Sequence, residues 1–201
     1  IEAGFPAASP TDAEAVSAVA RAVRGCEIMA LACCASADID AAGRALRAAA
    51  RPVIHLVLGV SDIHLERRPG FTRNRAVRVI QASVARARRY ADEVQFSLED
   101  ATRADPIFTR QCAEVAVTAG ATRINVADTA GCAAPEEFGA LVRDMVVFLE
   151  GRALVSAYCH NGAGLATANT VAAVRNGAAQ VQVAVNGPVA TTQIPDAGRL
   201  S

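Results

Sequence analysis

His160 and the carboxylate pair Glu99 and Asp100 are side chains whose types could support catalysis. His160 stands in the segment SAYCHNGAGLATAN, residues 156–169, whose pattern predicts a strand that delivers the histidine to the mouth of a pocket and then turns into a helix. An imidazole in such a place is suited to a divalent metal ion. Two adjacent carboxylates are suited to acid–base chemistry, although neighbours in sequence need not face each other and one can pair with an arginine. We expect Asp100 to be the structural member of the pair.

The sequence around these residues alternates short β-rich segments with longer alanine-rich helical patterns. Strands are predicted over residues 1–5, 26–32, 53–60, 92–97, 122–127, 153–158 and 180–185, and helices over 11–23, 38–49, 73–90, 106–119, 135–149 and 164–176. Strands of this kind, apolar on both faces, are typical of a parallel sheet covered by helices. His55 lies inside one such apolar segment, and we expect it to be a core histidine with its hydrogen bonds satisfied.

The polar residues at or just after the predicted strand ends favour one α/β architecture. They come from at least five different strands. A doubly wound sheet concentrates its site at one switch point, whereas a (β/α)8 barrel gathers residues from many strand ends into one mouth. These residues are Glu2, His64, Ser97, Glu99, Thr129 and His160. We therefore predict a (β/α)8 barrel, although the seven predicted strands leave it one short of the usual eight.

The composition excludes several classes of function. The 20 acidic and 20 basic residues balance, so no overall electric field favours a nucleic acid or an anionic membrane. The chain contains no lysine, which rules out a lysine Schiff base and a P-loop lysine. Its six cysteines form no CxxC pair, and no apolar run approaches about 18 residues. We expect a cytoplasmic protein with neither a nucleic acid nor a membrane as partner.

Six motifs follow one another in a fixed order along the chain. They are IEAGFPAASPTD, ALACCASADIDAA, VIHLVLGVSDIHLERR, DEVQFSLEDATR, GATRINVADTAG and the segment 153–169. In this order and at these separations they resemble the 2-isopropylmalate synthase and homocitrate synthase family of metal-dependent TIM barrels, and the isopropylmalate members most. The resemblance covers about residues 1–187 and implies a partial barrel, with strands two to eight present and strand one missing. Residues 188–201 form a divergent C-terminal tail.

The resemblance also implies a reaction and a set of site residues. Family members condense an acyl-CoA with a 2-oxoacid in a Claisen-type reaction of amino-acid biosynthesis, leucine biosynthesis among them. A divalent metal ion (Mn, Mg or Zn) polarises the 2-oxo group. By this resemblance, His64 and Glu99 are catalytic, Glu2, Ser97 and Thr129 bind the substrate, and His160 is a metal ligand.

The departures from the family pattern fall on the metal site. The family holds its metal with an aspartate of strand one and two histidines of a His-x-His motif. Tyr158 stands at the first histidine position and the aspartate has no counterpart, so His160 is the only surviving ligand. A catalytic divalent site usually needs three protein ligands. Cys159 should face away from both neighbours, because alternate residues of a strand point to opposite faces. The metal site is therefore predicted to be largely lost.

Two hypotheses follow from this pattern. The first is an acyltransferase acting on an acyl-CoA and a 2-oxoacid. The second is a catalytically inactive barrel fragment or pseudoenzyme that binds a small acid or acts as an interaction protein, and the losses at the metal site favour it. In either case, the open strand edges of an incomplete barrel invite pairing with another chain. We expect a homo-oligomer, or association through these edges.

Overall fold

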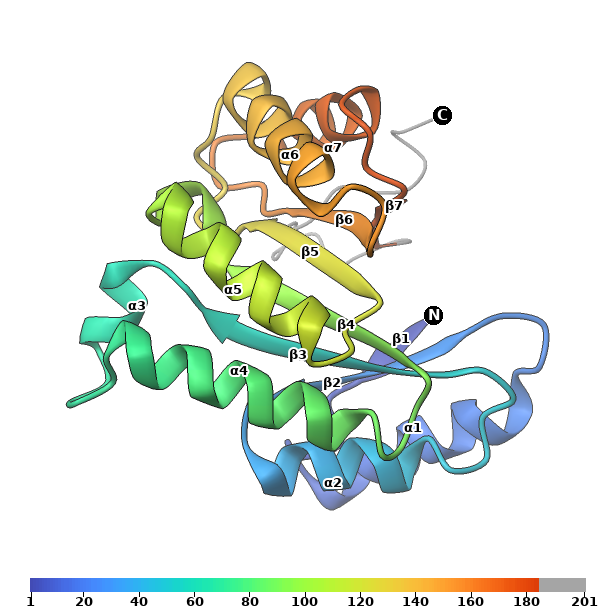
Figure 1. Ribbon diagram of the computed structural model, residues 1–201. Coiled ribbons are helices and arrows are strands. Elements are labelled where there is room, and N and C mark those ends of the chain that lie inside the picture. Colours follow the sequence, from blue (N-terminus) through green and yellow to red (C-terminus); the bar gives the residue numbers. More distant parts are fainter. Residues whose placement is uncertain (185–201) are drawn as a thin grey trace.

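The computed structural model describes residues 1–184, which form one curved parallel sheet covered by helices on its convex side (Figure 1). The strands are β1 (Glu2–Gly4), β2 (Ile28–Cys33), β3 (Pro52–Gly59), β4 (Glu93–Glu99), β5 (Arg123–Asp128), β6 (Leu154–Cys159) and β7 (Gln180–Val181). The helices are α1 (Pro10–Ala22), α2 (Ser36–Ala45), α3 (Asp62–Glu66), α4 (Arg73–Ala87), α5 (Pro106–Thr118), α6 (Pro135–Leu149) and α7 (Ala166–Arg175).

The strand order in the sheet is the order in the sequence, from β1 to β7. Every neighbouring pair is parallel. Within residues 1–184, β1 pairs only with β2 and β7 only with β6, so the sheet is an incomplete (β/α)8 barrel, as predicted. None of the described helices is long and apolar enough to cross a membrane.

The predicted strands and long helices are all present, with two local differences. Residues 62–66 form the short helix α3, so His64 lies in a helix and not in the predicted loop. The Ser61 hydroxyl accepts the backbone N–H of His64 and caps this single turn, which is too short to show a helical pattern in the sequence. Strand β7 has two residues, whereas the prediction ran from 180 to 185. The predicted tail, residues 188–201, lies outside the described residues.

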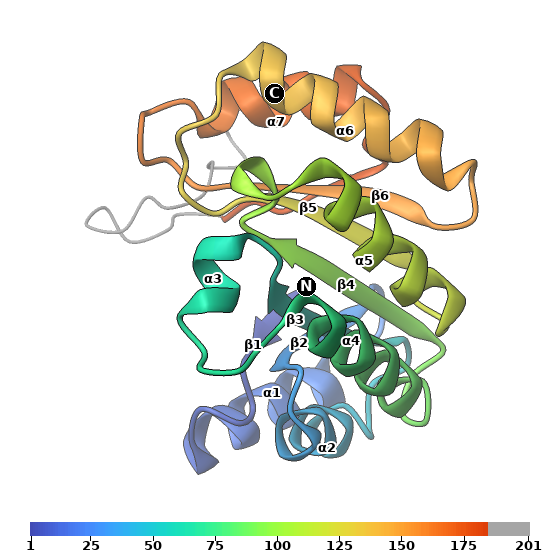
Figure 2. The ribbon, with the colours of Figure 1, turned by 60° about the vertical axis from the view of Figure 1, so that its left-hand side comes forward.

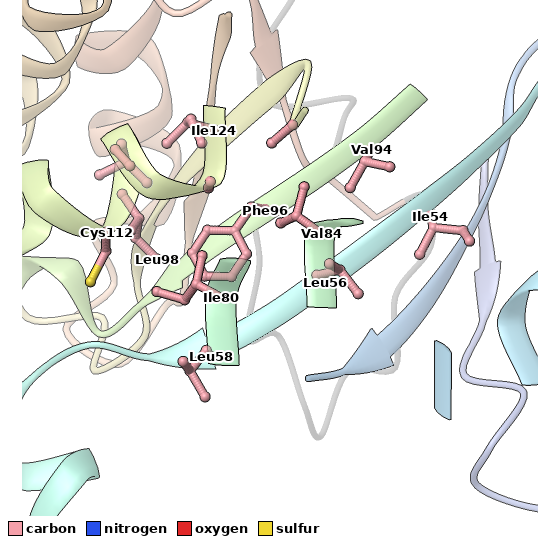
Figure 3. Packing of buried hydrophobic residues seen from close by; sticks show 14 of the residues in the cluster. Ile54, Leu56, Leu58, Ile80, Val84, Val94, Phe96, Leu98, Cys112 and Ile124 are labelled. Carbon is pink, nitrogen blue, oxygen red and sulfur yellow. The ribbon is translucent and has the colours of Figure 1, made fainter. Parts of the chain in front are cut away.

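The hydrophobic core lies between the convex face of the sheet and the helices. Leu56 and Leu58 of β3 and Phe96 of β4 point outward and pack with Ile80 and Val84 of α4 (Figure 3). All five side chains are essentially removed from water. Burial of each such side chain contributes about 1.5–3 kcal/mol to stability, so this layer fixes the position of the strands.

The concave face of the sheet is polar, and the expectation of strands apolar on both faces is therefore wrong. Every second residue of β3 to β6 points inward, and several of these side chains are buried and polar. They include His55, Gln95, Ser97, Arg123, Asn125 and Ser156. The outward residues already supply the hydrophobic burial, so the inward ones can be polar where they satisfy one another by hydrogen bonding.

All carboxyl ends of the strands lie at one rim of the barrel, because the strands are parallel. The helix α3 and the loops after β4, β5 and β6 stand at this rim (Figure 2). At the opposite rim, the guanidinium of Arg123 binds Glu27, Glu93 and Gln180. The mouth at the carboxyl rim is where a barrel of this kind gathers functional side chains.

Candidate functional site at the barrel mouth

Asp100, directly after β4, organises one side of the mouth. Its buried carboxylate accepts hydrogen bonds from Ser61 Oγ at 2.5 Å and from Arg103 Nε at 2.7 Å, and it lies 3.1 Å from His64 Nδ1. Its backbone is left-handed, with φ 63°, and its N–H donates to Thr129 Oγ1 at 2.9 Å. As expected, Asp100 pairs with an arginine. Its contacts also fix two of the predicted site residues, His64 and Thr129.

The charge of Asp100 determines which nitrogen of His64 carries hydrogen. Burial opposes ionisation of Asp100, but the hydrogen bonds from Arg103 and Ser61 outweigh it and hold the pKa of this carboxyl below its usual value. The ionised carboxylate only accepts, so His64 Nδ1 donates to it. His64 Nε2 is left facing the mouth, 3.7 Å from Glu99 Oε1. The two predicted catalytic residues are therefore neighbours.

Gly59, the last residue of β3, makes room for His64. A Cβ atom at this position would lie 2.6 Å from His64 Cβ and 2.7 Å from His64 Cγ. Real side chains avoid contacts this short. The absence of a side chain at Gly59 thus allows the imidazole to lie against the strand end and reach Asp100.

A second group of side chains crosses the barrel axis on the concave face. His55 Nδ1 lies 3.1 Å from Glu2 Oε1, and His55 Nε2 lies 2.6 Å from Ser97 Oγ. Asn125 Nδ2 donates to the same Ser97 oxygen at 2.8 Å. Gln182 Nε2 donates to the other Glu2 oxygen at 2.7 Å. The predicted substrate-binding residues Glu2 and Ser97 are thus joined through His55.

Tyr158 and His160 form a third group, connected to the first through Thr129. Tyr158 Oη lies 2.6 Å from His160 Nε2, and His160 Nδ1 lies 2.5 Å from the Thr129 carbonyl oxygen. A carbonyl only accepts, so Nδ1 carries the hydrogen and Nε2 accepts the Tyr158 hydroxyl. Cys159 is buried in the hydrophobic core on the other face, as predicted. Both nitrogens of His160 are therefore in use.

These donors do not fit a divalent metal ion. Nothing in residues 1–184 brings three or more His, Cys, Asp or Glu side chains together in a way that could hold a metal. Burial raises the pKa of Tyr158 to about 12, with the Glu2 charge adding to the effect, so its phenol is a poor anionic ligand. The lone pair of His160 Nε2 already accepts a hydrogen bond.

The raised pKa of Tyr158 predicts a loss of stability at alkaline pH. An unfolded phenol ionises at about pH 10, whereas the folded one stays neutral to about 12. The stabilisation is therefore complete below about pH 10 and declines as the pH rises toward 12. Urea unfolding over this range should show a steeper decline for the wild type than for Tyr158→Phe. Tyr90→Phe removes the other phenol, whose pKa is raised by its hydrogen bond to Asp40 but which is exposed, and it should change the slope less than Tyr158→Phe does. Equal slopes in wild type and Tyr158→Phe would contradict the assignment.

The mouth thus brings together His64, Glu99 and Thr129 in one cluster and Glu2 with Ser97 in another. Glu2 lies at the start of β1, so its predicted place at a strand end is wrong. Two members of the axial group, His55 and Asn125, were missed as site residues. His55 is buried and hydrogen-bonded, as predicted, but it faces the barrel axis and not the apolar core. The signal for Asn125 was the alternation of polar and apolar residues in RINVAD, whereas the apolar segment around His55 gave no such signal.

Comparisons with known proteins agree with this architecture. A family model described as HMGL-like matches residues 1–190. The 2-isopropylmalate synthase of Pelotomaculum thermopropionicum is 46% identical over 189 residues, and that of Listeria innocua is 43% identical over 189. Each match covers 93% of this chain and 37% of the relative. The crystal structure of Bacillus subtilis HMG-CoA lyase matches with a TM-score of 0.80 at 13% identity, over 98% of this chain and 70% of that one, which shows the shared fold.

The chain thus spans little more than a third of the length of the curated relatives that it matches. The part that it does span contains the six ordered motifs and the seven-stranded sheet. The chain therefore belongs to the HMGL-like family, and its similarity places it beside the 2-isopropylmalate synthases of that family.

Proposed function

We propose that this chain binds the anion of a 2-oxoacid at the barrel mouth, in a site of the 2-isopropylmalate synthase type that condenses an acyl-CoA with the oxoacid. The observation that carries the proposal is the state of the Thr129 hydroxyl. Its oxygen accepts the N–H of Asp100, so its own proton is available for a carboxylate. The hydroxyl belongs to the same hydrogen-bonded cluster as His64, whose Nε2 is free to take a proton.

In this proposal, His64 is the general base and Glu99 assists it. Asp100 holds His64 in the form that presents an unprotonated Nε2 to the mouth. That nitrogen would remove a proton from the acyl-CoA carbon next to the thioester. The Glu99 carboxylate, 3.7 Å from Nε2, would stabilise the imidazolium that results. The enolate would then attack the 2-oxo group, and water would release CoA from the product.

The second candidate is an inactive relative that retains only the acid pocket. The hydrogen bond between Tyr158 and His160 favours it, because this bond occupies the nitrogen that a metal would need. Both candidates share the carboxylate site. They differ in whether any acyl-CoA is consumed.

Calorimetric titration with pyruvate and branched-chain 2-oxoacids tests the shared site. Thr129→Val should weaken binding by about tenfold or more, because it removes a hydrogen bond to a charged group. Thr129→Ser keeps the hydroxyl and should bind like the wild type. Wild-type protein that binds none of these acids would contradict both candidates.

Release of free thiol from acyl-CoA then separates the two candidates. Release that requires an oxoacid and is lost in His64→Gln would support the acyltransferase. Oxoacid binding without any thiol release, with manganese, magnesium or zinc supplied, would support the inactive acid binder. Manganese titration of wild type and His160→Ala in parallel would show whether His160 binds a metal despite its contact with Tyr158.

We also propose that the chain associates through the edges of its sheet. Within the described residues, β1 and β7 each have one strand neighbour, which leaves backbone N–H and C=O groups on the other side. Light scattering should show a dimer or larger species. A monodisperse monomer would contradict this.

A further inference from the structure

The segment that joins α3 to the first turn of α4 is strongly basic. Residues 66–75 contain four arginines and a single acidic residue, Glu66. One of the four, Arg73, is bound by Asp62 and Asp105. The other three are exposed and form no ion pair with any of residues 1–184; they are Arg67, Arg68 and Arg75. The segment therefore carries a net positive charge.

Arg68 and Arg75 are held beside one aromatic ring. The Cζ atom of Arg68 lies 5.4 Å from the centroid of the Phe71 ring, and that of Arg75 lies 5.6 Å from it. A guanidinium within about 6 Å of a ring centroid is attracted to the ring. The backbone also fixes this loop, because Arg68 N–H donates to Leu65 O at 3.1 Å and Phe71 N–H donates to Arg68 O at 2.9 Å. We call Arg68, Phe71 and Arg75 the arginine platform.

The arginine platform lies beside the barrel mouth, in the loop that leads from α3 to α4 (Figure 2). Arg68 follows His64 by four residues along one helical turn, and residues at this spacing lie on the same side of a helix. Cys33, the last residue of β2, is influenced by both regions. Burial raises the pKa of its thiol, the charge of Glu99 adds to this rise, and the charge of Arg68 opposes it.

The mouth itself carries the opposite charge. Glu99 Oε1 lies 3.7 Å from His64 Nε2, and the Asp100 carboxylate lies 3.1 Å from His64 Nδ1. A phosphate group in the mouth would therefore be repelled by carboxylates, whereas at the arginine platform it would meet two unpaired cations. This distribution of charge suits an anionic molecule that places an uncharged end in the mouth and keeps its phosphates outside.

We propose that Arg68 and Arg75 bind the phosphate groups of the acyl-CoA at the outer edge of the mouth. This inference rests on the proposed function, in which His64 removes a proton next to the thioester, and it adds the residues that hold the other end of the molecule. The thioester and the pantetheine arm are uncharged, so they can pass Glu99 while the phosphates stay at the arginine platform. Guanidinium groups suit this role, because they bind two phosphate oxygens through parallel hydrogen bonds.

Calorimetric titration of the wild-type chain with acetyl-CoA and with acetylpantetheine tests the proposal. Acetylpantetheine has the same thioester end but no phosphate. We expect acetyl-CoA to bind at least about tenfold more tightly, because it gains hydrogen bonds between charged groups. Its affinity should fall as the salt concentration rises, whereas that of acetylpantetheine should not. Equal affinities for the two ligands would overturn the proposal.

Arginine variants locate the phosphate contacts. Arg68→Ala and Arg75→Ala should each weaken acetyl-CoA binding by about tenfold and leave the affinities for acetylpantetheine and for a 2-oxoacid unchanged. Arg68→Lys keeps the charge and should lose less than Arg68→Ala. Both positions are exposed, so urea unfolding of the variants should match that of the wild type. Wild-type affinity for acetyl-CoA in both alanine variants would overturn the proposal.

Arg89→Ala is the matched control. Arg89 is also exposed and lies just beyond the other end of α4, roughly 20 Å along the helix from Arg75. Its loss should leave acetyl-CoA binding unchanged. A loss equal to that of Arg68→Ala would overturn the proposal, because it would show that acetyl-CoA responds to the overall charge and not to the arginine platform.

The same titrations distinguish failure of this proposal from failure of the proposed function. A wild-type chain that binds a 2-oxoacid, and binds acetyl-CoA in a way that the arginine variants do not alter, would overturn the role of the arginine platform alone. Binding of the 2-oxoacid without any binding of acetyl-CoA would also overturn that role and would leave the inactive acid binder. Absence of binding for both ligands would overturn this proposal and the proposed function together.

Discussion

Replacing Gly131 with alanine is expected to destabilise the protein by about 3 kcal/mol or more, because the new Cβ meets backbone and not flexible side chain. It would lie 2.5 Å from the Gly162 nitrogen and 2.7 Å from the His160 carbonyl oxygen. The two loops cannot separate freely: Ala163 N–H donates to the Gly131 carbonyl at 2.8 Å, and His160 N–H donates to Asp128 O at 3.0 Å. Gly131 also has φ 65°, a left-handed conformation that disfavours alanine by about 1–2 kcal/mol.

Gly70→Ala separates the two contributions to this loss. Gly70 has φ 70°, but a Cβ there would meet nothing within 4 Å. Gly70→Ala should therefore lose only about 1–2 kcal/mol of stability, which is what alanine costs in a left-handed backbone conformation. Urea unfolding of both variants measures the difference. Equal losses would mean that the contact between the two loops does not constrain the fold, and that His160 is held by other contacts.

Asp100→Asn is expected to reduce stability by about 2–4 kcal/mol and to disturb His64. The amide keeps the shape of the carboxyl but removes the charge that Arg103 and His64 Nδ1 face. In the variant, an NH2 group replaces one of the two carboxylate oxygens. This group can only donate, yet Ser61, Arg103 and His64 all donate to this site. His64 is then no longer held with hydrogen on Nδ1, so any reaction that uses Nε2 as a base should slow with the loss of this tautomer.

The pH dependence of stability provides an independent measure of the same carboxyl. Its folded-state pKa lies below the unfolded value, so the stabilisation is present above about pH 3.9 and declines as the pH falls through the folded value. The stability of Asp100→Asn should therefore fall less than that of the wild type as the pH is lowered through this range. Asp62→Asn, in an exposed pair with Arg73, is the control and should change stability far less. Equal losses in the two variants would show that Asp100 is not the organising residue of the mouth.

Much of the fold follows from local patterns in the sequence. Within residues 1–184, the apolar segments and the helical patterns between them predicted all seven strands and six of the seven α-helices. The helix α3 was missed, because its five residues are held by the Ser61 cap and by contacts at the rim, which a single-turn segment does not reveal. The polar residues near many strand ends distinguished a barrel from a doubly wound sheet, since only a barrel brings those ends to one mouth.

The candidate site was less accessible to sequence reasoning. By the resemblance to the family, Ser97 and Thr129 were predicted to bind the substrate, Glu99 to be catalytic and His160 to bind a metal ion. His55 was predicted to lie in the core because its segment looks apolar from end to end. Successive residues of a strand face opposite sides of the sheet, so a shift of one residue decides whether a side chain contacts the helices or faces the barrel axis. That face is set by the packing of Leu56 and Leu58 against α4, a contact between distant segments.

The sequence by itself determined the element order and the family, and the resemblance predicted that Tyr158 stands where the family has a histidine. Only the tertiary structure decided what these side chains contact: Tyr158 donates to His160 Nε2, and His160 Nδ1 donates to the Thr129 carbonyl oxygen. It likewise decided that Asp100 orients His64 and that Glu2, His55, Ser97 and Asn125 form one chain. The physical reason is that element type depends on the period of apolar residues within one segment, whereas a hydrogen bond depends on angstrom-scale distances between segments far apart in the chain.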